Sequence, residues 1–174
     1  MIRVAVTGPE STGKTFLAEK LSAHFNCPLV EEYARVYLEK LNRPYTYEDV
    51  GQIAIAQMKQ EDDIILSRPD LLIADTELLV IKIWMEYKYG KTPDWLETKI
   101  MERQYDLYLL CVPDIPWIYD PLREHPGWGD FFYQWFRKEL LSRKFNFIEI
   151  SGKEQERTDK AIRAVKSLIS LEKP

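Results

Sequence analysis

The most constraining feature of the sequence is an octapeptide at residues 8–15, Gly-Pro-Glu-Ser-Thr-Gly-Lys-Thr, which fits the pattern G-x-x-x-x-G-K-[ST] throughout. A β-branched, apolar run precedes it at residues 2–7, and apolar residues at helical spacing follow it up to residue 25. Glycines allow a tight turn in which backbone N–H groups point at a phosphate, and the helix adds the positive end of its dipole. The octapeptide therefore predicts a phosphate-binding loop (P-loop) between a buried strand and a helix.

Each side chain type in the loop suits a nucleoside triphosphate. Lys14 supplies a compact cation for the β- and γ-phosphates, and the hydroxyl of Thr15 is expected on Mg²⁺. The alternative is a chance octapeptide or a glycine-rich turn that binds nothing. The residues predicted to hold the nucleotide are Gly8, Glu10, Ser11, Thr12, Gly13, Lys14 and Thr15.

Strand-like and helix-like patterns alternate along the rest of the chain. Expected strands lie at residues 2–7, 28–31, 70–75, 106–112 and 145–150, and expected helices at 14–25, 32–41, 47–66, 77–89, 95–103 and 154–171. Such alternation is typical of βαβ units around a parallel sheet. The prediction is a three-layer α/β P-loop NTPase fold of the nucleoside or nucleotide kinase type, formed by residues 1–174 as one domain with a five-stranded sheet.

Composition excludes several classes of protein. A formal net charge of −4 leaves no basic excess for nucleic acid, and no apolar run is long enough to cross a membrane. The apolar run at the start ends at Thr7-Gly8, too early for a secretion signal. Cys27 and Cys111 are expected to be reduced thiols, as is usual in the cytoplasm. A soluble cytoplasmic protein is expected, of undetermined oligomeric state, that binds neither nucleic acid nor membrane.

Two acidic sites follow predicted strands, at the sheet edge where ligands gather in open α/β folds. Asp75 ends an apolar strand, as does the carboxylate that supports the metal in P-loop proteins, although it could also cap the next helix. Glu32 follows the second strand within Glu-Glu-Tyr-Ala-Arg, and it could orient an attacking hydroxyl or merely favour a helix N-terminus.

The segment at residues 113–144 is unusual, because it holds four prolines, two glycines and three tryptophans before the last strand. It is predicted to form a helical lid. Arg123 and Arg137 are candidates to neutralise charge on the moving phosphoryl group, and Trp117 to stack on a flat ring. Alternatively, the aromatic residues anchor the segment and the arginines are solvated.

The class of P-loop protein can be narrowed. No Asn-Lys-x-Asp motif of the switch GTPases occurs, and an oligomeric AAA-type motor needs more length and usually a second helical domain. A kinase for a nucleoside or small metabolite is the favoured interpretation.

Three sequence blocks carry a family resemblance together with the P-loop: Glu32-Tyr33-Ala34-Arg35, Ile73-Ala74-Asp75-Thr76-Glu77, and Trp117-Ile118-Tyr119-Asp120-Pro121-Leu122-Arg123. In order and spacing they resemble the ribosylnicotinamide kinase domain of bacterial NadR-type proteins.

That resemblance implies ATP- and Mg²⁺-dependent phosphorylation of the ribose 5′-hydroxyl of nicotinamide riboside, giving nicotinamide mononucleotide. It also implies roles for residues. Catalysis would involve Lys14, Glu32, Asp75 and Arg123. ATP would be held by the P-loop and Arg137, and Mg²⁺ by Thr15 and Asp75. The residues expected to contact the substrate are Glu32, Tyr33, Arg35, Asp75, Trp117 and Asp120. Tyr119 departs from the family, which carries an acid there.

NadR-type proteins also carry an adenylyltransferase domain, and some a DNA-binding domain. The 174 residues contain no His-x-Gly-His motif, so neither further activity is expected of them. Two alternatives stay open. One is a kinase for a different nucleoside, nucleotide or metabolite, and the other is a non-catalytic module that binds ATP or GTP and signals to a partner.

Overall fold

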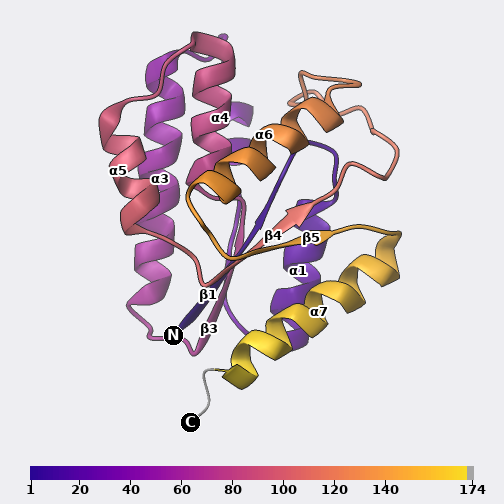
Figure 1. Ribbon diagram of the computed structural model, residues 1–174. Coiled ribbons are helices and arrows are strands. Elements are labelled where there is room, and N and C mark those ends of the chain that lie inside the picture. Colours follow the sequence, from indigo (N-terminus) through magenta and orange to yellow (C-terminus); the bar gives the residue numbers. More distant parts are fainter. Residues whose placement is uncertain (172–174) are drawn as a thin grey trace.

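The apolar runs form five parallel strands in a single sheet, according to the computed structural model, which describes residues 1–171 (Figure 1). The strands lie in the order β2-β3-β1-β4-β5, so that β1 is central and pairs with both β3 and β4. The predicted α/β class and the five-stranded sheet are confirmed. The strands are β1 (Ile2–Thr7), β2 (Leu29–Val30), β3 (Leu71–Asp75), β4 (Leu107–Cys111) and β5 (Phe147–Ile150).

Seven helices occur within the described residues, and six of them were expected from apolar spacing. Their bounds lie within two residues of the predicted ones, and β2 is the element most overestimated, because it pairs only at Leu29 and Val30 on the edge of the sheet. The helices are α1 (Lys14–Phe25), α2 (Tyr33–Glu39), α3 (Tyr47–Ile65), α4 (Leu78–Tyr89), α5 (Asp94–Glu102), α6 (Gly129–Ser142) and α7 (Glu154–Leu171).

The alternation of side chains along each strand divides the core between the two faces of the sheet. Val4 and Val6 of β1 belong to one buried cluster with α1 and α7, whereas Ala5 belongs to the other cluster with α3, α4, α5 and α6. Figure 1 shows α1 and α7 together on one side and α3, α4 and α5 grouped on the other. This three-layer arrangement holds the end of β1, and therefore the P-loop, in the middle of the molecule.

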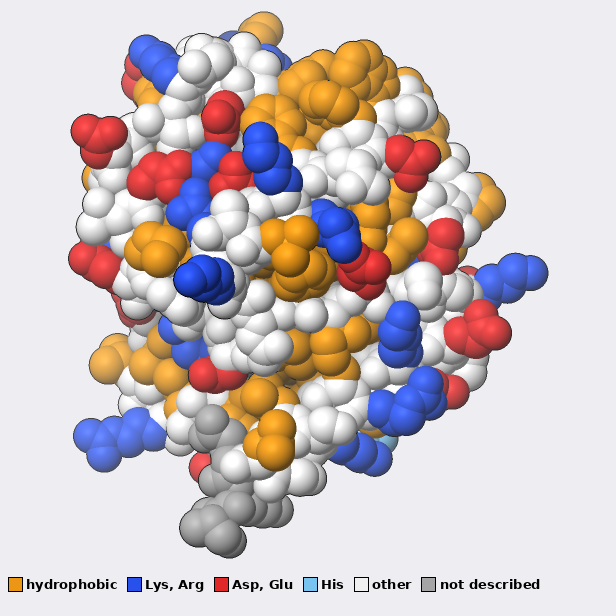
Figure 2. Space-filling view, in the orientation of Figure 1, with side chains coloured by type: hydrophobic (Ala, Val, Ile, Leu, Met, Phe, Trp, Pro, Cys, Tyr) orange, Lys and Arg blue, Asp and Glu red, His pale blue; other side chains and the backbone are white. Residues whose placement is uncertain are grey.

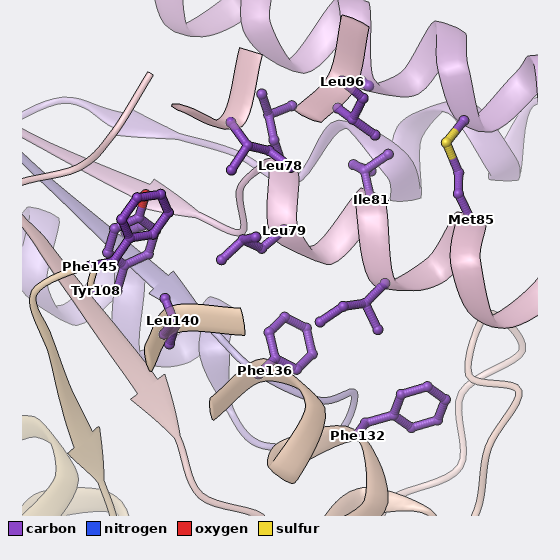
Figure 3. Packing of buried hydrophobic residues seen from close by; sticks show 14 of the residues in the cluster. Leu78, Leu79, Ile81, Met85, Leu96, Tyr108, Phe132, Phe136, Leu140 and Phe145 are labelled. Carbon is purple, nitrogen blue, oxygen red and sulfur yellow. The ribbon is translucent and has the colours of Figure 1, made fainter. Parts of the chain in front are cut away.

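The segment predicted as one helical lid, residues 113–144, is divided by the structure into two parts. Phe132, Phe136 and Leu140 of α6 are buried and turn towards α4 in the core (Figure 3). Their spacing of four residues places them on one face of the helix, which burial of apolar area then holds against the sheet. The other part, residues 113–128, contains no helix or strand.

The surface carries charges of both signs (Figure 2), and the two cysteines form no disulfide. Figure 2 shows acidic and basic side chains interspersed, with hydrophobic ones gathered over the region of α4 and α6, where Tyr87, Trp128 and Phe131 are exposed. Cys27 and Cys111 are free thiols, and burial raises the pKa of each to about 11. Within residues 1–171 no helix has both the length and the apolar character needed to span a membrane.

Candidate active site

The P-loop follows β1 directly and is curved as the octapeptide predicts. Gly8 has a φ of 129°, and a Cβ there would lie 2.9 Å from the backbone oxygen of Cys111, so the loop passes against β4 where only glycine fits. Gly13 has a φ of 77° at the start of α1. The hydroxyl of Thr12 and the ammonium of Lys14 both donate to the carbonyl of Pro9, at 2.8 Å and 2.7 Å. The loop is therefore closed by its own side chains and ends at a helix N-terminus.

Asp75 lies at the carboxyl end of β3, in register with Val6 of β1. It is only 2% exposed, and its Oδ1 has no hydrogen-bond partner. Burial raises the pKa of this carboxyl group to about 6; the hydroxyl of Thr15 opposes the rise, and the negative charge of Glu32 adds to it. Asp75 is thus a buried carboxylate beside the P-loop that lacks a partner for one oxygen.

The residue that caps the N-terminus of α4 is Glu77, and not Asp75, for which this role was the alternative. The Glu77 carboxylate accepts from the backbone N of Leu79 at 2.6 Å and from the hydroxyl of Thr7 at 2.8 Å. Between the two acids, Thr76 adopts a φ of 67°, which is unfavourable for a β-branched residue. The turn therefore separates a structural acid, Glu77, from an acid whose oxygen is available, Asp75.

The residues present fit a magnesium ion. Mg²⁺ in nucleotide sites is bound through one or two protein oxygens together with phosphate oxygens and water. The exposed hydroxyl of Thr15 and the unpartnered Oδ1 of Asp75 provide two oxygens of that kind. Within residues 1–171 there is no cluster of three or more His, Cys, Asp or Glu that would bind a metal without a substrate.

A cavity of about 680 Å³ extends from the P-loop, and several predicted site residues line it. Glu32 and Arg35 line it from the start of α2, and Arg123 from the segment 113–128. Glu32 occupies the N-cap position of α2, but its side chain makes no capping hydrogen bond there. Three sequence blocks that are far apart in the chain therefore meet at one cavity.

Another part of the cavity lining, here called the aromatic wall, was missed by the sequence analysis. Tyr45, Trp84 and Tyr87 line this wall with Lys88 and Glu124. Trp84 Nε1 donates to the Tyr45 oxygen at 3.0 Å, and the Tyr45 hydroxyl donates to Glu124 at 2.8 Å. Burial and Glu124 raise the pKa of Tyr45. A sequence signal did exist, because Trp84, Tyr87 and Lys88 are three and four residues apart on α4 and so share a face.

Not every predicted substrate residue reaches this cavity. Trp117 donates to Glu10 at 3.2 Å and lines a separate cavity of about 220 Å³. Tyr33 is packed against the core, with its backbone N bonded to Gln57. Asp120 is absent from the lining and instead forms a 3.0 Å ion pair with Arg35, which does line the large cavity.

Arg137, predicted to contact ATP, lies on α6 and is absent from the lining of the cavity. Its guanidinium pairs with Glu149 of β5 at 2.8 Å. The reason is the orientation of α6: the apolar face is buried in the core, so a residue one position after Phe136 points elsewhere. Of the two predicted arginines, Arg123 is the one that the structure brings to the P-loop, with Nη1 3.4 Å from the hydroxyl of Ser11. Arg157 of α7, which was not predicted, donates to the P-loop carbonyl of Thr12 at 3.0 Å.

The fold and the site together define a nucleotide-binding P-loop protein. A family model described as "AAA domain" matches residues 3–157, and the chain belongs to that family. The description does not distinguish motors from other members, so the sequence argument against an oligomeric motor stays a prediction.

Relatives support the resemblance to NadR-type proteins. The "trifunctional NAD biosynthesis/regulator protein NadR" of Salmonella typhimurium is 28% identical over 124 residues, which are 69% of this chain and 30% of the relative. The protein of the same description from Escherichia coli K12 gives the same figures. The chain thus spans less than a third of the length of these relatives.

Solved structures confirm the fold. The crystal structure of NadR protein in complex with NAD and AMP-PNP has a TM-score of 0.81 and 21% identity, covering 99% of this chain and 51% of that one. For NadR protein in complex with NR the TM-score is 0.79 at 22% identity, covering 96% and 51%. Deoxyadenosine kinase from M. mycoides, with products bound, has a TM-score of 0.67 at 14% identity, covering 95% of this chain and all of that one. The P-loop kinase fold is therefore shared across these proteins.

Proposed function

We propose that the protein is an ATP-dependent kinase that phosphorylates the ribose 5′-hydroxyl of nicotinamide riboside to give nicotinamide mononucleotide. The observation that carries the proposal is one cavity that is lined both by the P-loop and by the aromatic side chains of Tyr45, Trp84 and Tyr87. A triphosphate tail suits the P-loop, and a flat base suits the aromatic side chains. The shared fold with the NadR protein crystallised with NR, over 96% of this chain, adds support.

In the proposed reaction, the 5′-oxygen bonds to the γ-phosphorus as the bond to the β–γ bridging oxygen breaks, and ADP leaves. Glu32 accepts the hydroxyl proton, and Lys14 and Arg123 neutralise charge on the transferred group. Mg²⁺, held by Thr15 and Asp75, would supply further charge neutralisation when bound. The P-loop amides orient the phosphates, so most of the rate enhancement comes from positioning and electrostatics.

At the acceptor end, the nicotinamide ring of the riboside carries a positive charge. Aromatic rings such as those of Trp84 and Tyr87, which line the cavity, attract such a cation through their quadrupoles, whereas the ring of Tyr45 already carries the Lys88 ammonium 3.7 Å from its centroid. Trp117, the predicted stacking residue, lines the smaller cavity and is tied to Glu10. The proposal therefore assigns the base to the wall formed by α4 and Tyr45.

The direct test is a product assay. Purified protein is incubated with ATP, Mg²⁺ and a panel of nucleosides that includes nicotinamide riboside, deoxyadenosine and deoxycytidine, and products are identified by mass spectrometry. Nicotinamide mononucleotide is the expected main product. If another nucleoside turns over and nicotinamide riboside does not, the substrate assignment is wrong. ATP binding without any phosphorylated acceptor would favour the regulatory module instead.

A pair of matched variants tests which tryptophan meets the base. Trp84→Ala is expected to raise the KM for the nucleoside about fivefold or more, because one stacked base is worth roughly 1–3 kcal/mol. Trp117→Ala should change that KM by less than about threefold. An effect of Trp117→Ala as large as that of Trp84→Ala would overturn the assignment of the wall.

A further inference from the structure

Glu10 is an acid inside a phosphate-binding loop, which is unexpected on electrostatic grounds. A carboxylate near a polyphosphate raises the energy of the bound state by Coulomb repulsion. The sequence assigns Glu10 to nucleotide binding together with the rest of the loop, but its two carboxylate oxygens face N–H groups from a distant part of the chain. The contacts of this one side chain therefore call for a different role.

Three hydrogen bonds join Glu10 to the segment after β4. Oε1 accepts from the backbone N of His125 at 2.8 Å and from the indole Nε1 of Trp117 at 3.2 Å, and Oε2 accepts from the backbone N of Glu124 at 3.1 Å. The hydroxyl of the next loop residue, Ser11, accepts from the backbone N of Ile118 at 2.8 Å. Bonds to an ionised acceptor are stronger than neutral ones. Two P-loop residues thus hold both ends of residues 117–125.

The segment depends on these contacts, because residues 113–128 form no helix or strand that would fix their course. Among the described residues, the other ion pairs of residues 117–125 are Arg35–Asp120, 45% and 20% exposed, and Lys88–Glu124, 35% and 41% exposed. Asp114, before this stretch, pairs with Arg157 of α7. Solvated ion pairs contribute little to holding a loop. The Glu10 carboxylate, 23% exposed, instead accepts hydrogen bonds from three N–H groups of residues 117–125, so it is the attachment with several directional contacts.

Arg123 lies inside the held segment. Its guanidinium donates to the carbonyl of Ile118, lies 3.4 Å from the Ser11 hydroxyl and lines the large cavity. The next residue, Glu124, has its backbone N on Glu10 and its carboxylate on Tyr45. Residues 123–124 therefore bridge the P-loop and the aromatic wall, and the bridge is attached to the loop through Glu10.

We infer that Glu10 is a positioning residue, whose carboxylate fastens residues 117–125 to the P-loop and thereby holds Arg123 over the transferred phosphoryl group. The inference rests on the proposed kinase function and deepens it. An arginine that is already in place loses little freedom when the transition state forms, so its effect on rate is larger than that of a mobile one.

The first test is a double-mutant cycle in kcat with Glu10→Ala, Arg123→Ala and the double variant, using whichever nucleoside the wild-type protein phosphorylates. Glu10→Ala is expected to lower kcat about tenfold or more and to change the KM for ATP less than about threefold. When Arg123 is already replaced by Ala, the further change Glu10→Ala should lower kcat by less than about threefold. Additive losses, or a loss confined to KM, would overturn the inference.

The second test needs no substrate. Hydrogen–deuterium exchange of residues 117–125 is measured on wild-type protein and on Glu10→Ala. The matched control is Glu102→Ala of α5, because within residues 1–171 Glu102 pairs only with the exposed Lys99. Exchange at Glu124 and His125 should accelerate at least about tenfold in Glu10→Ala alone, while α4 stays protected. Unchanged exchange would overturn the inference.

The two tests separate this inference from the proposed function. Lack of nicotinamide riboside turnover by the wild-type protein counts against the proposed substrate only, whereas unchanged exchange counts against the role of Glu10 whatever the substrate is. If Glu10→Ala does not fold, Glu10→Gln takes its place in both measurements. That variant keeps the size of the side chain but replaces one acceptor oxygen with a donor, so the same changes are expected in the same direction.

Discussion

The position of Gly8 allows a quantitative prediction about stability. In Gly8→Ala, the new Cβ would lie 2.9 Å from the backbone oxygen and 3.2 Å from the backbone nitrogen of Cys111. Neither atom can move alone, because β1 and β4 are paired from Val4 to Thr7. The methyl group therefore forces the two central strands apart or the P-loop away from β4.

Two terms make up the expected loss. A non-glycine residue at a φ of 129° is strained by about 1–3 kcal/mol. Overpacking of a tight site adds about 1–3 kcal/mol. The free energy of unfolding should thus fall by about 2–6 kcal/mol, a large part of the ~5–15 kcal/mol available to a domain.

The matched control is Gly90→Ala at the end of α4. Gly90 also has a positive φ, 68°, but a Cβ there meets no atom within 4 Å. It should lose only the backbone term, about 1–2 kcal/mol. Both variants are unfolded in urea and compared at constant m-value by circular dichroism. Equal losses in the two variants would refute the close approach of the P-loop to β4.

Further predictions concern single charges. Lys14→Ala should abolish phosphoryl transfer in the product assay while leaving the circular dichroism spectrum unchanged; full turnover would contradict the site assignment. Arg137→Ala should change the KM for ATP by less than about twofold relative to the wild-type protein, because Arg137 pairs with Glu149. A larger rise in this KM would indicate that Arg137 contacts the nucleotide. Arg43 holds the pKa of Asp49 well below its ordinary value of 3.8, so Asp49 stabilises the fold above pH ~4 and less below it. The stability deficit of Asp49→Asn in urea should therefore shrink as pH falls below ~4, and a constant deficit would contradict the ion pair.

Local pattern was sufficient for most of the fold. The octapeptide at residues 8–15 forms a P-loop between β1 and α1, whose bounds the alternation and spacing of apolar residues predicted to the residue. Such patterns act within a few residues, because a strand or helix must bury its apolar side wherever it packs. Asp75 and Glu32, both expected at the carboxyl edge of the sheet, lie close enough that the charge of Glu32 raises the pKa of Asp75.

What the sequence could not resolve were the roles of single tryptophan and arginine side chains. Trp117 and Trp84 look alike as sequence signals, yet Trp84 lines the large cavity and Trp117 bonds to Glu10. Arg123 and Arg137 were equal candidates, and only Arg123 lies in the cavity. The contacts that place Trp117 and Arg123, to Glu10 and Ser11, join segments more than a hundred residues apart.

The sequence by itself determined the sheet, the P-loop and the carboxylate at the end of β3, since each follows from short-range backbone preferences and burial. The tertiary structure decided that the apolar face of α6 packs into the core, that α4 forms the aromatic wall, and that Glu10 faces residues 117–125. Those outcomes depend on which way a helix face or a loop carboxylate turns. That choice is made when distant elements compete for the same buried space and the same hydrogen-bond donors.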